Sequence, residues 1–403
     1  MVTLGVSVYP DIRPLDEIKD YLRLCSKYGF TRVFSSMFSV EGTKEEVLAY
    51  FRDLIEAAHE VGMKVSLDVN PMCMEKLGCT PDDIKVFDDI RCDIIRMDMS
   101  YGDEGDLKLI GNPYGIQIQF NASSNNFVQN LLDKGADLNR MFVGHNFYPQ
   151  RYTGLKWNKF LETNANLAKT GVRIEAFVAS HAPNTHGVWD AVCGLPTVEM
   201  MRDMPIDLQA RLLMATGNVT DILIGNAYAS EEELASMADL AKDPEIDWNN
   251  QGLQRYKRYM GNDYENIVKN MVRNQKIIKV KLVDDITPAE RESLFDFFPH
   301  SDPGDSSEWI WRCRGPRLIY GDANKDRSED MKIKVRPYDK EYFEVGDVVI
   351  VNENYDHYAG EIQIVRIPII NDGTHNLIGH IDDQEYVMMQ LIKDGDLVKF
   401  VEK

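Results

Sequence analysis

The sequence predicts an α/β protein in which a (β/α)8 TIM barrel is followed by a smaller, mainly β domain. Three observations lead to this prediction. Apolar strand-like segments alternate with amphipathic segments over the first 240 or so residues. Beyond Lys242 short strand-like runs follow one another, separated by Gly-Asp and Asp-Gly turns. The chain has 403 residues, more than a single hydrophobic core usually holds, so two domains are expected.

The alternation in the first part of the chain has the size of a barrel. Strands are predicted at 4–10, 31–39, 64–71, 93–102, 115–123, 140–149, 173–180 and 220–230. The segments between them have helical periodicity: in 43–63, one face carries Val47, Phe51, Leu54, Ile55 and Ala58. Strand–helix alternation predicts a parallel sheet covered by helices. A doubly wound open sheet is the alternative, but its GxGxxG turn is missing after the first strand, so the barrel is favoured.

Three parts of the chain are expected: the barrel at 1–245, a connector and helix at 246–276, and the β domain at 277–403. In the β domain the strand-like runs lie at 277–283, 309–315, 345–353, 360–370 and 376–382. Their short, glycine-containing turns predict a mainly antiparallel sheet.

Composition narrows the function classes. A net charge of −20 argues against nucleic acid as a partner, because phosphate backbones are held by excess Lys and Arg. No signal-like N-terminus and no run of 18 apolar residues occurs, so we expect a cytoplasmic protein that binds no membrane.

The six cysteines form no CxxC pair, and His181 and His186 belong to no HxH or HExxH motif. We therefore expect reduced thiols, no metal and no cofactor; a homodimer is compatible with the sequence.

Strand parity points to a polar barrel interior. Residues two apart share a face of a strand. In three consecutive strands one face is apolar and must meet the helices. The other face is largely polar and turns inward toward the C-terminal strand ends, where barrel enzymes carry their chemistry. This inward set contains Asp68 and Asn70, Arg96 and Asp98, and Gln119 and Asn121. The structural alternative is an ion pair of Arg96 with Asp98 and mutually bonded amides.

The other strand ends supply further candidates. After the sixth strand, "HNFYPQRYTG" offers Asn146, Tyr148 and Tyr152, residue types that often contact sugars. After the eighth, "IGNAYAS" places Asn226 near a predicted helix start at Ser230.

The loop after the seventh strand holds the rigid stretch "GLPTVEMMR", with Glu199 and Arg202. It lies over the same barrel mouth as Asp68 and Asp98. Three carboxylates there suit glycoside hydrolysis, in which one acid protonates the leaving oxygen and a second attacks or activates water. The structural alternative makes Glu199 a helix-start carboxylate stabilised by the helix dipole.

Several motifs in order resemble the MupG-like 6-phospho-N-acetylmuramidases, glycoside hydrolase family 170. They are "LGVSVYP", "LDVNP" (67–71), "RMDMSYG" (96–102), "FNAS" (120–123), "HNFYPQRYTGL" (145–155), "GLPTVEMMR" (194–202), "DILIGNAYAS" (221–230), "GEIQIVR" and "NLIGHI". The resemblance covers essentially the whole chain. It implies a barrel followed by a cyclophilin-like β domain, without metal or organic cofactor. The motifs carry Asp68, Arg96, Asp98, Glu199 and Arg202.

The resemblance also implies a substrate. The expected reaction is cytoplasmic hydrolysis of the disaccharide MurNAc 6-phosphate–GlcNAc to MurNAc 6-phosphate and GlcNAc during bacterial peptidoglycan recycling. One departure concerns the stretch before "GLPT": the family pattern has Arg-Gly-Pro, whereas this chain has "HAPNTHGVWDAVC". An arginine that could hold an anionic group of the substrate is therefore absent there.

The second domain carries a basic cluster in an acidic protein, "WRCRGPR", and later "NENYDHYAGEIQI". We expect Arg312, Tyr358 and Glu361 to help bind the phosphate or lactyl carboxylate, because an arginine fork suits both groups. Solvated surface charge is the alternative.

Two other functions would use the same barrel. A phosphosugar lyase or isomerase would yield an unsaturated or rearranged sugar, because a fold does not fix its chemistry. A non-catalytic sugar-phosphate sensor would bind without turnover.

Overall fold

The computed structural model describes residues 2–9, 12–38, 42–122, 127–302 and 304–403. By its internal contacts the chain divides into two compact units, Met1–Lys242 and Asp243–Lys403, and each is described by itself.

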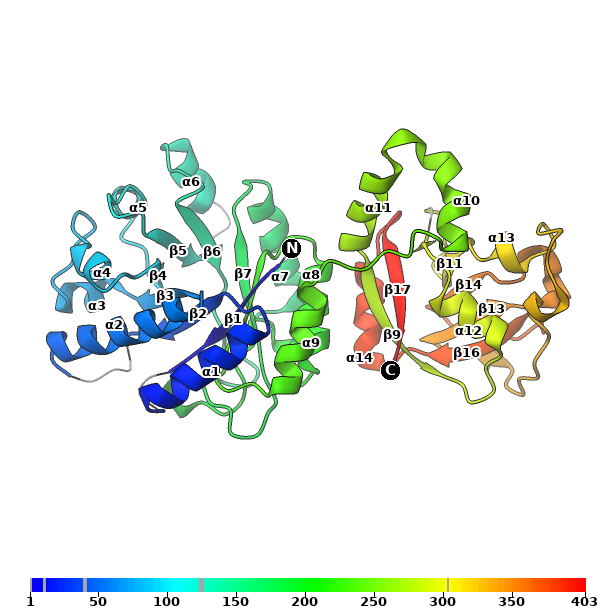
Figure 1. The fold of residues 1–403 in the computed structure, drawn as a ribbon, viewed down its shortest axis with the longest axis horizontal. Coiled ribbons are helices and arrows are strands. Elements are labelled where there is room, and N and C mark those ends of the chain that lie inside the picture. Colours follow the sequence, from blue (N-terminus) through cyan, green and yellow to red (C-terminus); the bar gives the residue numbers. More distant parts are fainter. Residues whose placement is uncertain (1, 10–11, 39–41, 123–126, 303) are drawn as a thin grey trace. The chain divides into compact units, whose positions relative to one another are not determined.

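The first unit is a closed barrel of eight parallel strands in chain order, surrounded by helices (Figure 1), which confirms the predicted fold. Its strands are β1 (Thr3–Ser7), β2 (Arg32–Ser36), β3 (Lys64–Val69), β4 (Ile94–Met97), β5 (Gln117–Asn121), β6 (Met141–Gly144), β7 (Ile174–Val178) and β8 (Asp221–Ile224). The helices are α1 (Leu15–Lys27), α2 (Lys44–Glu60), α3 (Pro71–Lys76), α4 (Lys85–Asp89), α5 (Asp103–Ile110), α6 (Phe127–Asp133), α7 (Trp157–Ala168), α8 (Ile206–Ala215) and α9 (Glu231–Ala241). Two 3₁₀ turns, η1 (Val188–Asp190) and η2 (Glu199–Met201), lie between β7 and α8.

Helix α2 shows how the sequence specifies the outer layer. Thr43 and Glu46 form a capping box at its start, which supplies partners for amides that a helix leaves unpaired. The predicted apolar face is buried against the barrel. Gly62, with φ of 76°, ends the helix in a backbone conformation that glycine adopts without strain.

Several strands end earlier than the periodicity predicted. β4 ends at Met97 rather than at residue 102, and β3 ends at Val69. Asn70 and Asp98, directly beyond these ends, continue the polar alternation of the strands although they no longer belong to the sheet. Pro10, Ser39 and Ser123, the last residues of three predicted strands, lie outside the described residues.

A layer of buried charge fills the middle of the barrel. The Arg32 guanidinium donates to Glu175 at 3.0 Å and to Asp221 at 3.2 Å, and all three residues are almost fully buried. Gln119 donates to the other oxygen of Glu175 at 2.6 Å. Glycine is needed at 144, because a Cβ there would lie 2.0 Å from the Gln119 amide nitrogen. The sequence analysis did not identify this charged layer.

The second unit is built on a mainly antiparallel sheet of seven strands in the order β10-β17-β9-β16-β13-β14-β11, with a separate pair, β12-β15. The strands are β9 (Lys276–Leu282), β10 (His300–Ser301), β11 (Ile310–Cys313), β12 (Tyr342–Phe343), β13 (Asp347–Val351), β14 (Ile362–Val365), β15 (Ile369–Ile370), β16 (His375–His380) and β17 (Leu397–Glu402). The helical elements are α10 (Gln251–Met260), η3 (Gly261–Asp263), α11 (Tyr264–Arg273), α12 (Pro288–Phe295), α13 (Arg317–Tyr320), η4 (Glu329–Met331), η5 (Glu353–Tyr358), α14 (Asp383–Tyr386) and η6 (Val387–Leu391).

The mainly β character of this unit is confirmed, with one addition. The sequence analysis did not predict β17, which pairs in parallel with β9 from Val398 opposite Lys276 onward. Among the described residues no helix is both long and apolar enough to cross a membrane.

His145, directly after β6, makes the stability of the barrel depend on pH. Burial lowers the pKa of its imidazole to about 4, although Nε2 donates to Asn164 at 2.6 Å. In the unfolded chain this pKa is about 6.5, so between pH 6.5 and 4 only the unfolded state takes up the proton. We expect the free energy of unfolding of the barrel to fall by about 3 kcal/mol from this group over that interval, and no further below it.

His145→Gln, which keeps a donor for Asn164 but does not titrate, should flatten this part of the pH dependence. Hydrogen exchange of the barrel strands, followed by mass spectrometry between pH 7 and 4, measures it. An unchanged slope in the variant would contradict the assignment to His145.

Candidate active site at the barrel mouth

Above the charged layer, the C-terminal ends of four neighbouring strands bring polar side chains together around Arg96. The guanidinium Nη1 donates to Asp68 at 2.5 Å and lies 3.4 Å from Asp98. Its Nη2 donates to Asn146, and Asn121 donates to the same Asn146 oxygen at 3.0 Å. The structure thus joins these five predicted site residues in one network.

The two carboxylates of this network have different environments. Burial raises the pKa of Asp68 to about 6, against the opposing effect of Arg96, and the Asp98 charge adds to the rise. The Asp98 side chain is 38% exposed, compared with 10% for Asp68. One acid is therefore buried and able to keep a proton near neutral pH, while the other is open to solvent and ligands.

Three phenylalanines form an apolar wall that adjoins the network through Phe147, the residue after Asn146, and that was not predicted from the sequence. The rings of Phe34, Phe147 and Phe177 pack edge to face at centroid distances of 5.2 to 5.6 Å. Phe34 and Phe177 belong to a buried cluster with Tyr9, Leu195 and Leu223. A sequence signal for the wall was present. Phe34 lies two residues after Arg32 on β2, and Phe177 lies two residues after Glu175 on β7, so each phenylalanine shares the inward face of its strand with a charged residue.

The stretch "GLPTVEMMR" holds its carboxylate, Glu199, in a dense set of hydrogen bonds. Glu199 accepts four hydrogen bonds, from the Tyr152 and Gly154 amides at 2.6 and 2.8 Å and from Arg202 at 2.8 and 2.7 Å. These donors, Arg202 foremost, lower the pKa of Glu199 to about 2. A carboxylate that is ionised and fully occupied cannot serve as the general acid. The geometry instead makes Glu199 a clamp between two mouth loops.

The Arg202 side chain is likewise fully engaged in hydrogen bonds within the protein. It is 2% exposed, and its five N–H groups reach Glu199 and the carbonyls of Cys193, Gly194 and Gln150. Its N–H groups are therefore all bonded within the protein in this structure, and its predicted contact with a substrate stays a prediction.

Thr197 connects this loop to the polar network. Its hydroxyl donates to the Asn146 carbonyl at 3.0 Å and accepts from the Phe177 amide at 2.9 Å. The Tyr148 amide donates to the Pro196 carbonyl at 3.2 Å, and the half-buried Tyr148 side chain lies on the same loop as Asn146. The stretch 194–202 thus holds the backbone of Asn146 in place.

Three other predicted binding residues have structural partners. Asn70 caps α3 through a hydrogen bond from the Cys73 amide at 2.8 Å. The Asn226 side chain bonds both the amide and the carbonyl of Ser180, at 2.8 and 2.9 Å. Tyr152 contributes its backbone to the Glu199 clamp, while its side chain is 87% exposed.

The predicted residues of the second unit form a cluster of their own. Glu361 is 1% exposed and accepts from Arg312 at 2.8 Å, with Arg317 at 3.4 Å from the same oxygen. The Arg317 guanidinium lies 3.9 Å from the centre of the Tyr358 ring. Gln363 occupies the other oxygen of Glu361 at 2.9 Å. Glu361 is therefore a structural counter-ion to these arginines.

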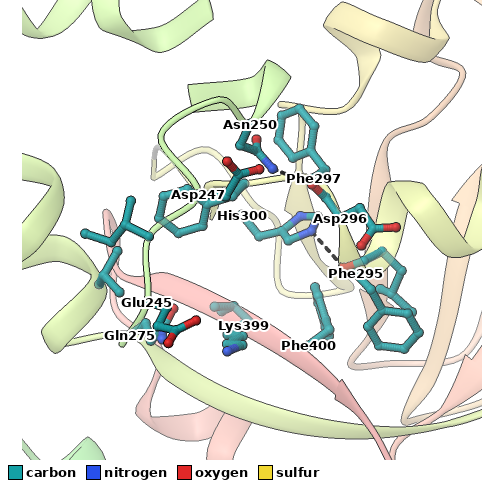
Figure 2. Close-up of a pocket in the computed structure, with 15 residues that line it drawn as sticks. Glu245, Asp247, Asn250, Gln275, Phe295, Asp296, Phe297, His300, Lys399 and Phe400 are labelled. Atoms are coloured by element: carbon teal, nitrogen blue, oxygen red, sulfur yellow. Dashed lines mark hydrogen bonds between the residues drawn. The ribbon is translucent and has the colours of Figure 1, made fainter. Parts of the chain in front are cut away.

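A cavity of about 160 Å³ also lies in the second unit (Figure 2). Figure 2 shows His300 among Asn250, Phe297 and Phe400; its Nε2 bonds the Leu294 carbonyl at 3.0 Å. Lys399 is the one Lys or Arg among its described lining residues. In the part of the chain that the structure describes, no group of three or more His, Cys, Asp or Glu side chains is placed to hold a metal ion. The two carboxylates with unlike exposure on Arg96 make the barrel mouth our candidate for acid–base chemistry.

Comparison with known proteins identifies the family of the chain. Residues 4–239 match the family described as 6-phospho-N-acetylmuramidase, N-terminal, and residues 276–401 match its C-terminal counterpart. The fold is similar to an uncharacterised B. cereus protein, with a TM-score of 0.81 and 30% identity over 100% of this chain and 99% of that chain. A conserved Enterococcus faecalis protein of unknown function has a TM-score of 0.63 and 22% identity, over 100% and 96%. A search of curated proteins finds no match.

The clamp formed by Glu199 leads to a prediction about stability. Glu199→Gln removes the charge from its bonds with Arg202 and should lower the free energy of unfolding by about 1.5–3 kcal/mol. It should also speed hydrogen exchange in residues 145–155. Urea unfolding and exchange mass spectrometry measure the two effects. The matched control is Glu162→Gln, since the exposed pair Lys159–Glu162 on α7 should contribute less than about 1 kcal/mol. Unchanged stability with lost catalysis would instead place Glu199 on the substrate.

Proposed function

The chain belongs to the 6-phospho-N-acetylmuramidase family and is a glycosidase, and from this premise we propose that it hydrolyses MurNAc 6-phosphate–GlcNAc at the barrel mouth, with Asp68 and Asp98 as the catalytic pair. The products are MurNAc 6-phosphate and GlcNAc. The observation that carries the proposal is the pair of unlike carboxylates on one buried arginine. A role in bacterial cell-wall recycling in the cytoplasm follows from the substrate.

Asp68 is proposed as the general acid. Breaking a glycosidic bond requires a proton on the departing GlcNAc oxygen, and the donor must still hold that proton at working pH. Burial raises the pKa of Asp68 to about 6, which meets this requirement. Arg96 keeps the shift from becoming larger, so the acid remains strong enough to give its proton up.

Asp98 is proposed as the partner at the anomeric carbon. Both carboxylates contact Nη1 of Arg96, at 2.5 and 3.4 Å. Their contacting oxygens must therefore be closer together than the roughly 6.5–9.5 Å of inverting glycosidases, which leave room for a water. The short separation favours retention, by direct attack of Asp98 or by Asp98 orienting the 2-acetamido oxygen of the substrate.

The surroundings suit a sugar. Asn121 belongs to the network and carries an amide, Tyr148 carries a phenol on the same loop as Asn146, and the Phe147 ring offers an apolar surface. In this assignment the sugar lies over the polar half of the mouth with its apolar face toward the phenylalanine wall.

The acid assignment is tested by Asp68→Asn. On MurNAc 6-phosphate–GlcNAc, kcat should fall by about 10²–10⁴-fold. On the 4-nitrophenyl glycoside of MurNAc 6-phosphate, release of nitrophenolate should fall far less, since this leaving group needs no proton. For the wild type, kcat/KM should fall as pH rises through about 6, because Asp68 then loses its proton. Asp20→Asn, at an exposed position on α1, is the control. Equal losses on both substrates would contradict the acid role.

The stereochemical assignment is tested by proton NMR of freshly formed MurNAc 6-phosphate. We expect the initial product to keep the anomeric configuration of the substrate, because the two carboxylates are too close for an intervening water. An inverted initial product would exclude Asp68 and Asp98 as the pair. Mass spectrometry of the same reaction should show GlcNAc; an unsaturated or rearranged sugar would indicate a lyase or isomerase instead.

A further inference from the structure

The phosphate of the proposed substrate needs cations, and the mouth arginines are already engaged. The two terminal nitrogens of Arg96 contact Asp68, Asp98 and Asn146. Arg202 has all its donors within the loop clamp. Arg151 makes two hydrogen bonds to Asp203, at 2.7 and 2.9 Å. A dianion would therefore have to break an existing pair to bind any of these side chains.

A cavity of about 580 Å³ at the ends of β2 and β3 offers two cations that are not engaged in this way. Lys44, the first residue of α2, and Lys76, the last residue of α3, both line it, together with Phe38, Asn70 and Cys73. Among the described residues neither lysine has an ion pair or hydrogen bond from its ammonium group. Both lysines are exposed, so ligands can reach them.

The Lys44 ammonium group approaches the short segment that carries Lys76. A Cβ built on Gly78 would lie 3.3 Å from the Lys44 Nζ, and Gly78 follows Lys76 by two residues. Charge effects on the cysteines of this segment agree. Burial raises the pKa of Cys79 to about 11 with Lys44 opposing the rise, and burial raises the pKa of Cys73 to about 11 with Lys76 opposing it.

The cavity adjoins the proposed general acid. Asn70, in its wall, follows Asp68 by two residues, and Cys73, also in its wall, has a pKa that the Asp68 charge raises and the Lys76 charge lowers. In the substrate one sugar ring separates the 6-phosphate from the anomeric carbon. A phosphate at the lysines therefore fits a ring placed over the acid.

We propose that Lys44 and Lys76 form the phosphate subsite for the 6-phosphorylated sugar and give the enzyme its preference for phosphorylated over unphosphorylated substrate. This inference rests on the proposed function. Lysine suits the task because its compact ammonium pairs with a phosphate dianion from several directions. The site supplies binding and orientation, and no chemical step passes through it.

The test is isothermal titration calorimetry on the full chain with MurNAc 6-phosphate and with MurNAc. Lys44→Met with Lys76→Met should weaken binding of MurNAc 6-phosphate by about tenfold or more for each lysine and leave MurNAc binding unchanged. Lys44→Arg with Lys76→Arg should restore most of the affinity. The matched control, Lys159→Met with Lys169→Met on and just after α7, removes the same charge elsewhere on the barrel. In kinetics, the first double variant should raise KM and largely keep kcat.

The outcomes separate this proposal from the proposed function. Unchanged binding of MurNAc 6-phosphate in the double variant, or an equal loss for both ligands, would overturn the lysine subsite while leaving glycosidase activity intact. Wild-type protein that binds MurNAc 6-phosphate through these lysines but cleaves no disaccharide would support the subsite and overturn the proposed reaction.

Discussion

A buried arginine in the barrel interior is the constraint on which the site depends. Removing a guanidinium from water costs several kcal/mol unless acids and hydrogen-bond acceptors surround it. Arg96 is 4% exposed, and Asp68, Asp98 and Asn146 converge on it from three different strand ends. The same arrangement is present one layer below, where Arg32 is held by Glu175 and Asp221. Because the Arg96 guanidinium needs these partners, it holds the strand ends together and keeps the Asp68 and Asp98 carboxylates at a short separation.

The arginines that hold the scaffold together are therefore already paired and are not open to an anionic ligand. Arg96, Arg202 and Arg312 each contact a buried or partly buried carboxylate, and in each case the pairing fixes a loop or a strand end. If the substrate is a phosphorylated sugar, as we propose, its phosphate must then be bound by cations that packing does not require. Exposed lysines at the rim meet that condition, since a lysine side chain can reach a ligand without disturbing the buried pairs.

The sequence was sufficient for the barrel and for the inward-facing residues at the ends of β3, β4 and β5, because both follow from period-two and period-3.6 patterns; it did not show the charged layer around Arg32. Asp68, Arg96 and Asn121 lie on the faces that strand parity gave them. The loops could not be predicted in this way. Glu199 gains its partners from the Tyr152 and Gly154 amides, and no sequence pattern shows which backbone donors a loop will present. The hydrogen bond of Asn226 with Ser180, from the preceding β–α loop, could not be predicted either. In the second unit, β17 was missed because its parallel pairing with β9 joins the two ends of that unit.

Asp68 and Glu199 show why a conspicuous carboxylate in a motif does not identify a catalytic acid. Both contact an arginine, and both lie at the C-terminal face of the barrel. Glu199 is bonded by four donors while remaining partly exposed, and its pKa falls to about 2. Asp68 is more deeply buried, shares its arginine with a second acid, and its pKa rises to about 6. Hydrogen bonds from donors lower the pKa of a carboxyl group, and burial away from water raises it. The balance of these two effects therefore decides which acid can keep a proton, and it is set by the folded loops and strands around each acid.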